Sequence, residues 1–257
     1  MQIQLLQINK KSSIIFLMIT LISSYLLTAH KSFQPPDPIH PKTIFILSPS
    51  TGSSLVSPIQ LQAEVTCNPN NFVRIELIDT NRNLLYRQVI RHECGIASIF
   101  KLNESIYFDT NKKDSLARLT ISLLDNSSRI LAISSVNLAL SNEKQSLLPS
   151  PLNQTDFLII SPKEDSLTQG GSLMVYGWVN PPNMSPVILE LISESGKLIG
   201  SRQILIHNNL LEDFQYFEIN IPYDIPGIQL VRFTIRQMGE KIPGNVSLES
   251  QIIQLGP

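Results

Sequence analysis

Cys67 and Cys94 are the only cysteines in the chain, and their thiols offer the clearest chemistry in the sequence. Two thiols can form a disulfide when the fold brings their Cα atoms within about 7 Å of each other in an oxidising compartment. The alternative is a pair of free thiols too far apart to join. A bridge over this span would stabilise the fold by roughly 3–4 kcal/mol, because it removes loop-closure entropy from the unfolded chain.

The stretch RHEC places His92, Glu93 and Cys94 side by side, and these are residue types that bind metal ions. Consecutive residues of an extended chain point to opposite sides, and no second cluster completes a tetrahedral site. No serine or cysteine lies in a nucleophile motif. We therefore predict no catalytic residue, no metal site and no cofactor, and we do not expect an enzyme.

The segments that contain these residues belong to an internal sequence repeat. The stretch VRIELIDTNRNLLYRQVI at 73–90 is matched by VILELISESGKLIGSRQIL at 187–205, with a shift of 114 residues. The same shift relates RLTI at 118–121 to RFTI at 232–235. A shift that is kept from one end of a unit to the other indicates a duplicated domain.

Each copy has the length of a small domain. We predict a first domain over 43–140, a linker with two prolines and no periodicity over 141–155, and a second domain over 156–257. Apolar and polar residues alternate with a period of two in both copies, which is typical of half-buried β-strands. The inward set in the first copy is Ile59, Leu61, Ala63, Val65, Val73, Ile75, Leu77, Leu119, Ile121 and Leu123.

The turn signals between these strands give about seven short strands in each copy. We therefore predict an all-β fold of two tandem immunoglobulin-like antiparallel β-sandwiches after an N-terminal hydrophobic helix, with a barrel as the alternative. Cys67 ends the strand that runs through Ala63, and Cys94 follows the second strand after it. Both cysteines then lie at the same end of the first sandwich, which favours the disulfide.

The second copy differs from the first on the outward side of one strand. The outward positions Met174, Tyr176 and Trp178 correspond to polar residues 114 positions earlier, which are Gln60, Gln62 and Glu64. An apolar, aromatic patch on a strand face indicates contact with another surface. That surface is either the first domain or the spacer of this chain, or a protein or sugar ring that docks there.

Residues 1–29 join a basic start to an uncharged apolar run, SSIIFLMITLISSYLLTA. This order predicts a signal peptide, and the run is also about long enough for an uncleaved membrane anchor. Either way the rest of the chain is exported, because Lys10 and Lys11 favour the cytoplasmic side. Residues 30–42 contain four prolines and form a spacer.

Each copy opens with a hydrophobic strand, a Ser-Pro pair, a turn and an alternating strand. This order resembles the immunoglobulin-like modules of bacterial extracytoplasmic proteins, including the spore-germination type. The matching residues are Pro49, Gly52, Ser57 and Pro58 in the first copy and Pro162, Gly177 and Gly196 in the second. The first copy departs from the pattern with Ala63 at the position of Gly177, and the second lacks the later Ser-Pro. The resemblance implies the fold, and a fold does not by itself specify a ligand.

These features indicate a non-catalytic extracytoplasmic module that serves adhesion, envelope architecture or partner display. The alternative is an accessory subunit of an envelope or secretion assembly, held to the membrane by residues 12–29. We expect its partner to be an envelope or surface protein or a glycan, with the membrane as a further contact if the N-terminal segment is retained. A net charge of −1 without a basic patch argues against nucleic acid.

Overall fold

The computed structural model describes residues 43–109, 115–143, 145–149, 156–206 and 214–257, which all belong to one compact unit. Every regular element in this part of the chain is a β-strand. None of the described residues forms a helix with the length and hydropathy needed to cross a membrane. The predicted signal or anchor at 1–29 and the spacer at 30–42 lie outside the described residues.

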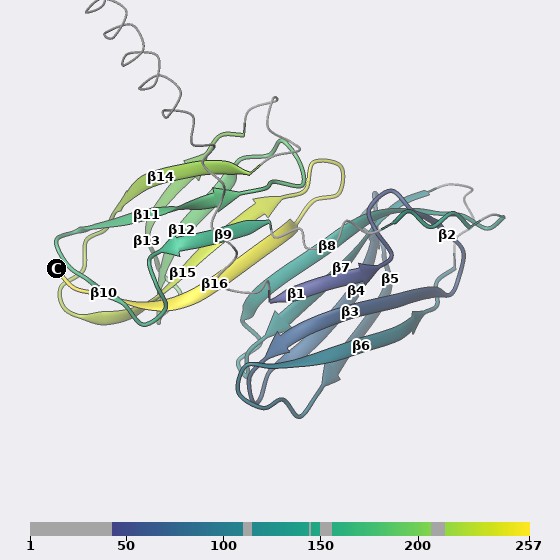
Figure 1. The fold of residues 1–257 in the computed structure, drawn as a ribbon, viewed down its shortest axis with the longest axis horizontal. Coiled ribbons are helices and arrows are strands. Elements are labelled where there is room, and N and C mark those ends of the chain that lie inside the picture. Colours follow the sequence, from purple (N-terminus) through teal and green to yellow (C-terminus); the bar gives the residue numbers. More distant parts are fainter. Residues whose placement is uncertain (1–42, 110–114, 144, 150–155, 207–213) are drawn as a thin grey trace, which may run out of the picture. The chain divides into compact units, whose positions relative to one another are not determined.

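The first copy contains two facing sheets (Figure 1). One sheet has the order β1-β3-β6, formed by β1 (Ile44–Ser48), β3 (Ile59–Cys67) and β6 (Ser98–Ile106). The other has the order β5-β4-β7-β8, formed by β5 (Leu84–Arg91), β4 (Phe72–Asp79), β7 (Ser115–Leu124) and β8 (Ile130–Leu140). All these neighbours are antiparallel, and the short β2 (Ser54–Leu55) pairs in parallel with the end of β8.

The second copy repeats this arrangement strand for strand. One sheet has the order β9-β11-β14, formed by β9 (Phe157–Ser161), β11 (Ser172–Val179) and β14 (Gln215–Pro222). The other has the order β13-β12-β15-β16, formed by β13 (Leu198–Ile204), β12 (Val187–Ser193), β15 (Gln229–Met238) and β16 (Asn245–Leu255). The short β10 (Leu167–Thr168) pairs in parallel with the end of β16. The duplication read from the sequence is therefore a duplication of topology.

Each copy has its own hydrophobic core between its two sheets. The first core contains the inward residues that the alternation predicts, among them Ile59, Ile75 and Leu119, and the second is built around Phe233 and Val175. This architecture and the strand order, in which early and late strands share a sheet, are those of an immunoglobulin-like sandwich. The predicted fold class is confirmed for the described residues, which show eight strands per copy because a two-residue strand adds to the seven expected.

The two copies also share a strand pairing that the sequence analysis did not anticipate. β8 pairs with β16 in antiparallel fashion, and this joins the larger sheets of the two copies into one ten-stranded sheet. Part of the predicted linker is also held in place, since Ser54 and Ser146 exchange backbone hydrogen bonds and Ser53 Oγ accepts from the Leu148 amide. Ser146 and Leu148 of the predicted linker are thus hydrogen-bonded to the first copy, although residues 145–149 remain exposed.

Candidate functional site

The two cysteines are joined in a disulfide, with their Cα atoms 5.9 Å apart. Cys67 is the last residue of β3 and is only 2% exposed, while Cys94 lies in the loop that follows β5. Because β3 and β5 belong to different sheets, the bridge ties the two layers of the first sandwich together at one end. Pro181 and Asn208 take the equivalent positions in the second copy, so the bridge belongs to the first copy alone.

The side chains around this disulfide are engaged in packing. The imidazole ring of His92 stacks on Phe100 with the ring centroids 4.5 Å apart, and the Asn68 side chain accepts a hydrogen bond from the Ala97 amide. Within the described ranges, no group of three or more His, Cys, Asp or Glu side chains is arranged to hold a metal ion. The RHEC stretch therefore forms a loop stabilised by the bridge and by an aromatic stack.

The outer side of β11 carries the three residues singled out in the second copy. Met174 is 40% exposed and Tyr176 is partly exposed, but Trp178 is only 8% exposed. Trp178 lies on the outer side, as the alternation predicts, because its neighbours Val175 and Val179 belong to the core. The accessible part of this surface therefore lies at Met174 and Tyr176.

Tyr216 on β14 also belongs to this surface and was not among the residues predicted from the sequence. Tyr216 is paired with Trp178 across the two strands, is 45% exposed, and meets the indole edge to face with a centroid distance of 5.3 Å. Its hydroxyl donates a 3.0 Å hydrogen bond to Glu218 Oε2. Desolvation, followed by this carboxylate, raises the pKa of the Tyr216 hydroxyl, which stays protonated at neutral pH. We call Met174, Tyr176 and Tyr216 the contact face.

The positions of the first copy that correspond to this surface are polar, although Ile99 of β6 lies on the same side and is 59% exposed. Gln60, Gln62 and Glu64 of β3 are paired with three residues of β6, which are Ser105, Asn103 and Lys101. The same backbone framework therefore presents amides and charges in one copy and a thioether and two phenols in the other. The side chains at these positions therefore differ between the copies, while the strand pairing around them is the same.

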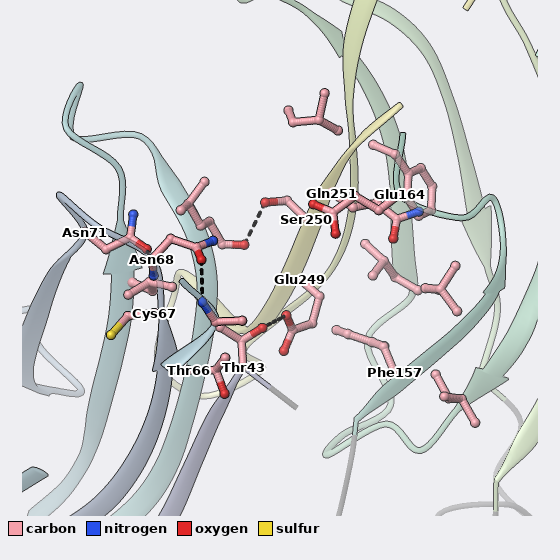
Figure 2. A pocket seen from close by; sticks show the side chains of 18 residues that line it. Thr43, Thr66, Cys67, Asn68, Asn71, Phe157, Glu164, Glu249, Ser250 and Gln251 are labelled. Atoms are coloured by element: carbon pink, nitrogen blue, oxygen red, sulfur yellow. Dashed lines mark hydrogen bonds between the residues drawn. The ribbon is translucent and has the colours of Figure 1, made fainter. Parts of the chain in front are cut away.

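A groove of about 520 Å³ runs where residues of the two copies approach each other (Figure 2). Thr43 and Asn68 line it from the first copy, and Phe157 and Glu249 line it from the second. Several of its polar side chains bond to protein groups: Thr43 Oγ1 donates a 2.8 Å hydrogen bond to Glu249 Oε2, and Asn68 Oδ1 accepts from the Ala97 amide. We therefore interpret the groove as a seam between the copies.

Comparison with known proteins does not identify a family. No protein-family model and no curated protein matches the chain. Among solved structures, the chain is similar to the fibronectin(III)-like modules of CbhA from Clostridium thermocellum, at 10% identity, a TM-score of 0.25, and coverage of 83% of this chain and 93% of that one. The resemblance to spore-germination-type modules stays a prediction.

Two further solved structures are similar over part of their length. A red sea bream transglutaminase matches at 12% identity and a TM-score of 0.28, over 83% of this chain and 32% of that one. A tetra-tandem repeat from the extending region of a large adhesion protein matches at 13% identity and a TM-score of 0.25, over 82% and 48%. Likenesses this distant add nothing to what the strand order already shows.

Proposed function

We propose that this protein is an exported, non-catalytic module of the cell envelope that binds a partner through the contact face of its second copy. The observation that carries the proposal is the contrast between the equivalent strand faces of the two copies. Three aligned outward positions are polar on β3 and apolar or aromatic on β11, while the core positions beneath them keep their character. An exposed surface of this kind on a soluble domain is typical of an interaction site.

Two features support export. The disulfide between Cys67 and Cys94 would be reduced in a cytosol with an ordinary thiol poise, and it persists in oxidising compartments. The basic start and apolar run of residues 1–29 have the order of an export signal. Both features belong to the same chain and predict the same side of the membrane.

The composition of the contact face favours a protein partner. The largest ring, that of Trp178, is buried and is not available to stack on a sugar. What remains exposed is a flexible thioether at Met174 and the phenols of Tyr176 and Tyr216, which are side chains enriched at the centres of protein–protein interfaces. Glu218 and Asn220 lie beside them on β14 and supply a polar border.

The test compares matched variants of the full exported chain on isolated envelopes. The variant Met174→Gln, Tyr176→Gln and Tyr216→Gln removes the apolar side chains of the contact face and leaves the core untouched. The control variant Gln60→Ala and Gln62→Ala alters the equivalent face of the first copy. We expect the first variant to lose about 10-fold or more in retention, since exposed aromatic anchors contribute over about 1 kcal/mol each, and the control to bind like the natural chain.

Treatment of the envelopes identifies the class of partner. Prior proteolysis of the envelopes should abolish retention of the natural chain, and digestion of their glycans should leave it unchanged. Equal retention of the two variants would refute the contact face, and loss of retention after glycan digestion alone would refute the protein partner.

An anchored accessory subunit would share this contact face and differ at the N-terminus. The uncharged run within residues 1–29 has the length of a membrane span, which is the observation in its favour. The intact mass of the mature chain decides between the two forms, since cleavage removes about 3 kDa and an anchor retains it.

A further inference from the structure

The strands that join the two copies occupy the same place in the repeat. β8 spans 130–140 and β16 spans 245–255, so equivalent residues are 115 apart. At the centre of the pairing, Ile133 lies opposite Leu248. These two residues occupy equivalent positions in the two copies. Ser134 lies opposite Ser247 and Ala132 lies opposite Glu249 on either side. A quasi-two-fold axis between Ile133 and Leu248 therefore exchanges the two strands of the pairing.

Side chains repeat this exchange across the axis. Ser135 Oγ donates a 2.7 Å hydrogen bond to the carbonyl oxygen of Val246, and Ser250 Oγ donates a 2.7 Å hydrogen bond to the carbonyl oxygen of Leu131. Ser250 is the counterpart of Ser135, and Val246 is the counterpart of Leu131, at the same spacing of 115. Each copy thus offers the other the same donor and the same acceptor.

A pair of equivalent arginines extends the exchange to the neighbouring hairpins. Arg118 on β7 donates from Nη1 to the Ile242 carbonyl oxygen at 2.7 Å and from Nη2 to the Pro243 carbonyl oxygen, both in the turn between β15 and β16. Its counterpart Arg232 on β15 reaches the corresponding turn of the first copy. There its Nη1 donates to the Ile130 carbonyl oxygen at 3.4 Å, and Nη2 lies 3.7 Å from Asp125 Oδ2.

The site that receives Arg118 is shaped for a guanidinium group. Arg118 is 3% exposed, and burial lowers the pKa of its guanidinium, which nevertheless stays charged. A Cβ at Gly239 would lie 2.3 Å from Arg118 Nη1, and one at Gly244 would lie 2.8 Å from Nη2. Only glycine at these two positions leaves room for the guanidinium between the turn and its carbonyls. A buried charge requires such a set of acceptors.

We propose that the β8 and β16 edges form a self-complementary docking surface whose partner is another copy of the same sandwich. In this chain each copy occupies the edge of the other, and the association does not depend on the linker. An interface in which the same patch is used on both sides is isologous, which is the geometry of two-fold dimers. The proposal uses no residue of the contact face, so it stands or falls independently of the proposed function.

The experiment separates the linker from the junction in the full chain. A specific protease site is introduced within 150–155, the chain is folded and then cut, and the mass of the product is measured by light scattering after size exclusion. We expect the two fragments to elute together at the mass of the uncut chain. Separation of the natural fragments at micromolar concentration would overturn the proposal.

Substitution of Arg118 tests the specific contacts of the junction. In the cut chain, Arg118→Met should weaken the association of the fragments about 10- to 100-fold, since it removes charge-assisted hydrogen bonds that cross the junction. The control is Arg202→Met, because the Arg202 side chain is exposed and, among the described residues, donates to the carbonyl oxygen of its neighbour Ser201 and not across the junction. An affinity unchanged by Arg118→Met would overturn the role of the arginine.

A second variant keeps the test decisive if Arg118→Met does not fold. The double variant Ser135→Ala and Ser250→Ala removes the two equivalent hydroxyl donors and leaves the charged groups in place. We expect the double variant to weaken fragment association about 10-fold. The two single variants should contribute roughly equal factors, because the two hydrogen bonds are related by the quasi-two-fold axis. No loss of affinity in the double variant would overturn the proposed exchange.

Discussion

Removal of the disulfide by Cys94→Ser should destabilise the first copy by about 3.5 kcal/mol. The bridge closes a loop between residues 27 apart in sequence, and the loss of loop-closure entropy in the unfolded chain accounts for a stabilisation of this size. Cys94 itself is only partly buried against the first core, and serine is close to cysteine in size, so the substitution removes little native packing. The expected effect therefore comes mainly from the unfolded state.

Cys67 stays in place in this variant. It is buried at the end of β3 and contributes to the core, and its sulfur lies 3.7 Å from the carbonyl oxygen of Ser98. A free Cys behaves as a small apolar side chain in such a position. The substitution at Cys94 is thus a cleaner perturbation than one at Cys67, which would also leave a cavity.

Urea unfolding with two probes measures the effect and locates it. Far-UV circular dichroism follows both copies, and Trp178, the only tryptophan, reports the second copy. At a slope of about 1.5–2 kcal/mol/M, the midpoint of the first copy should fall by about 2 M. The fluorescence midpoint should move less, because the bridge lies wholly within the first copy. The natural chain unfolded in reductant serves as the matched control and should behave like Cys94→Ser.

A loss below about 1 kcal/mol would refute this reasoning, because it would mean that the unfolded chain is not constrained by the bridge. A fluorescence midpoint that falls as far as the dichroism midpoint would show instead that the copies unfold as one cooperative unit. That result would extend the role of the β8–β16 junction from docking to folding stability.

Two further predictions concern the second copy. Gly177→Ala should lower the free energy of unfolding by about 2–4 kcal/mol, since its Cβ would lie 2.2 Å from the carbonyl oxygen of Leu158. The equivalent change in the first copy, Ala63→Gly, should lower it by only about 0.5–1 kcal/mol. Thermal unfolding of the two variants checks the contrast. The hydrogen bonds from Arg236 hold the pKa of Glu190 below its usual value of 4.5, so this carboxylate contributes stability above about pH 4.5 that is lost as the pH falls through its folded-state pKa. Glu190→Gln should flatten the fall of the melting temperature between about pH 5 and pH 3, and parallel profiles for the two proteins would contradict the prediction.

The sequence was sufficient to predict the strands and the inward side of each strand. Period-2 alternation depends only on which side of a strand faces a core, and residues such as Ile75 and Val175 have core environments that their own strand specifies. The duplication added the prediction of two domains, because one spacing of 114 residues relates the two copies. The ends of β3 and β5 then followed, and with them the proximity of Cys67 and Cys94.

The outward sides could not be read in the same way, because their burial depends on what covers them. Trp178 was correctly placed on the outer side, but nothing in its own strand says that the indole is covered or that Tyr216 lies beside it. Arg118 also alternates with inward residues and is nevertheless buried, since the other copy covers it. The match between Arg118 and Arg232 was visible in the repeat, but it gave no sign that each arginine reaches the opposite copy.

The pairing of β8 with β16 also covers edge strands that would otherwise be exposed in each copy. An uncovered edge strand exposes unpaired backbone groups and invites association with other chains. β8 and β16 cover part of each other's edge through the quasi-two-fold pairing, and β2 and β10 pair with their far ends. The strands at the two ends of the ten-stranded sheet, β5 and β13, carry arginines, among them Arg87, Arg91 and Arg202, which oppose the addition of further strands.

The junction and the outer strand faces are therefore under different constraints. The larger sheets are held to each other by equivalent contacts, so a change in one copy at Ser135 or Ser250 breaks half of a matched pair. The outer faces of β11 and β3 take no part in that pairing, and each is free to change without loss to the other. A polar face at Gln62 and an apolar one at Tyr176 can therefore coexist on one conserved framework, and the contact face is expected where the junction imposes no constraint.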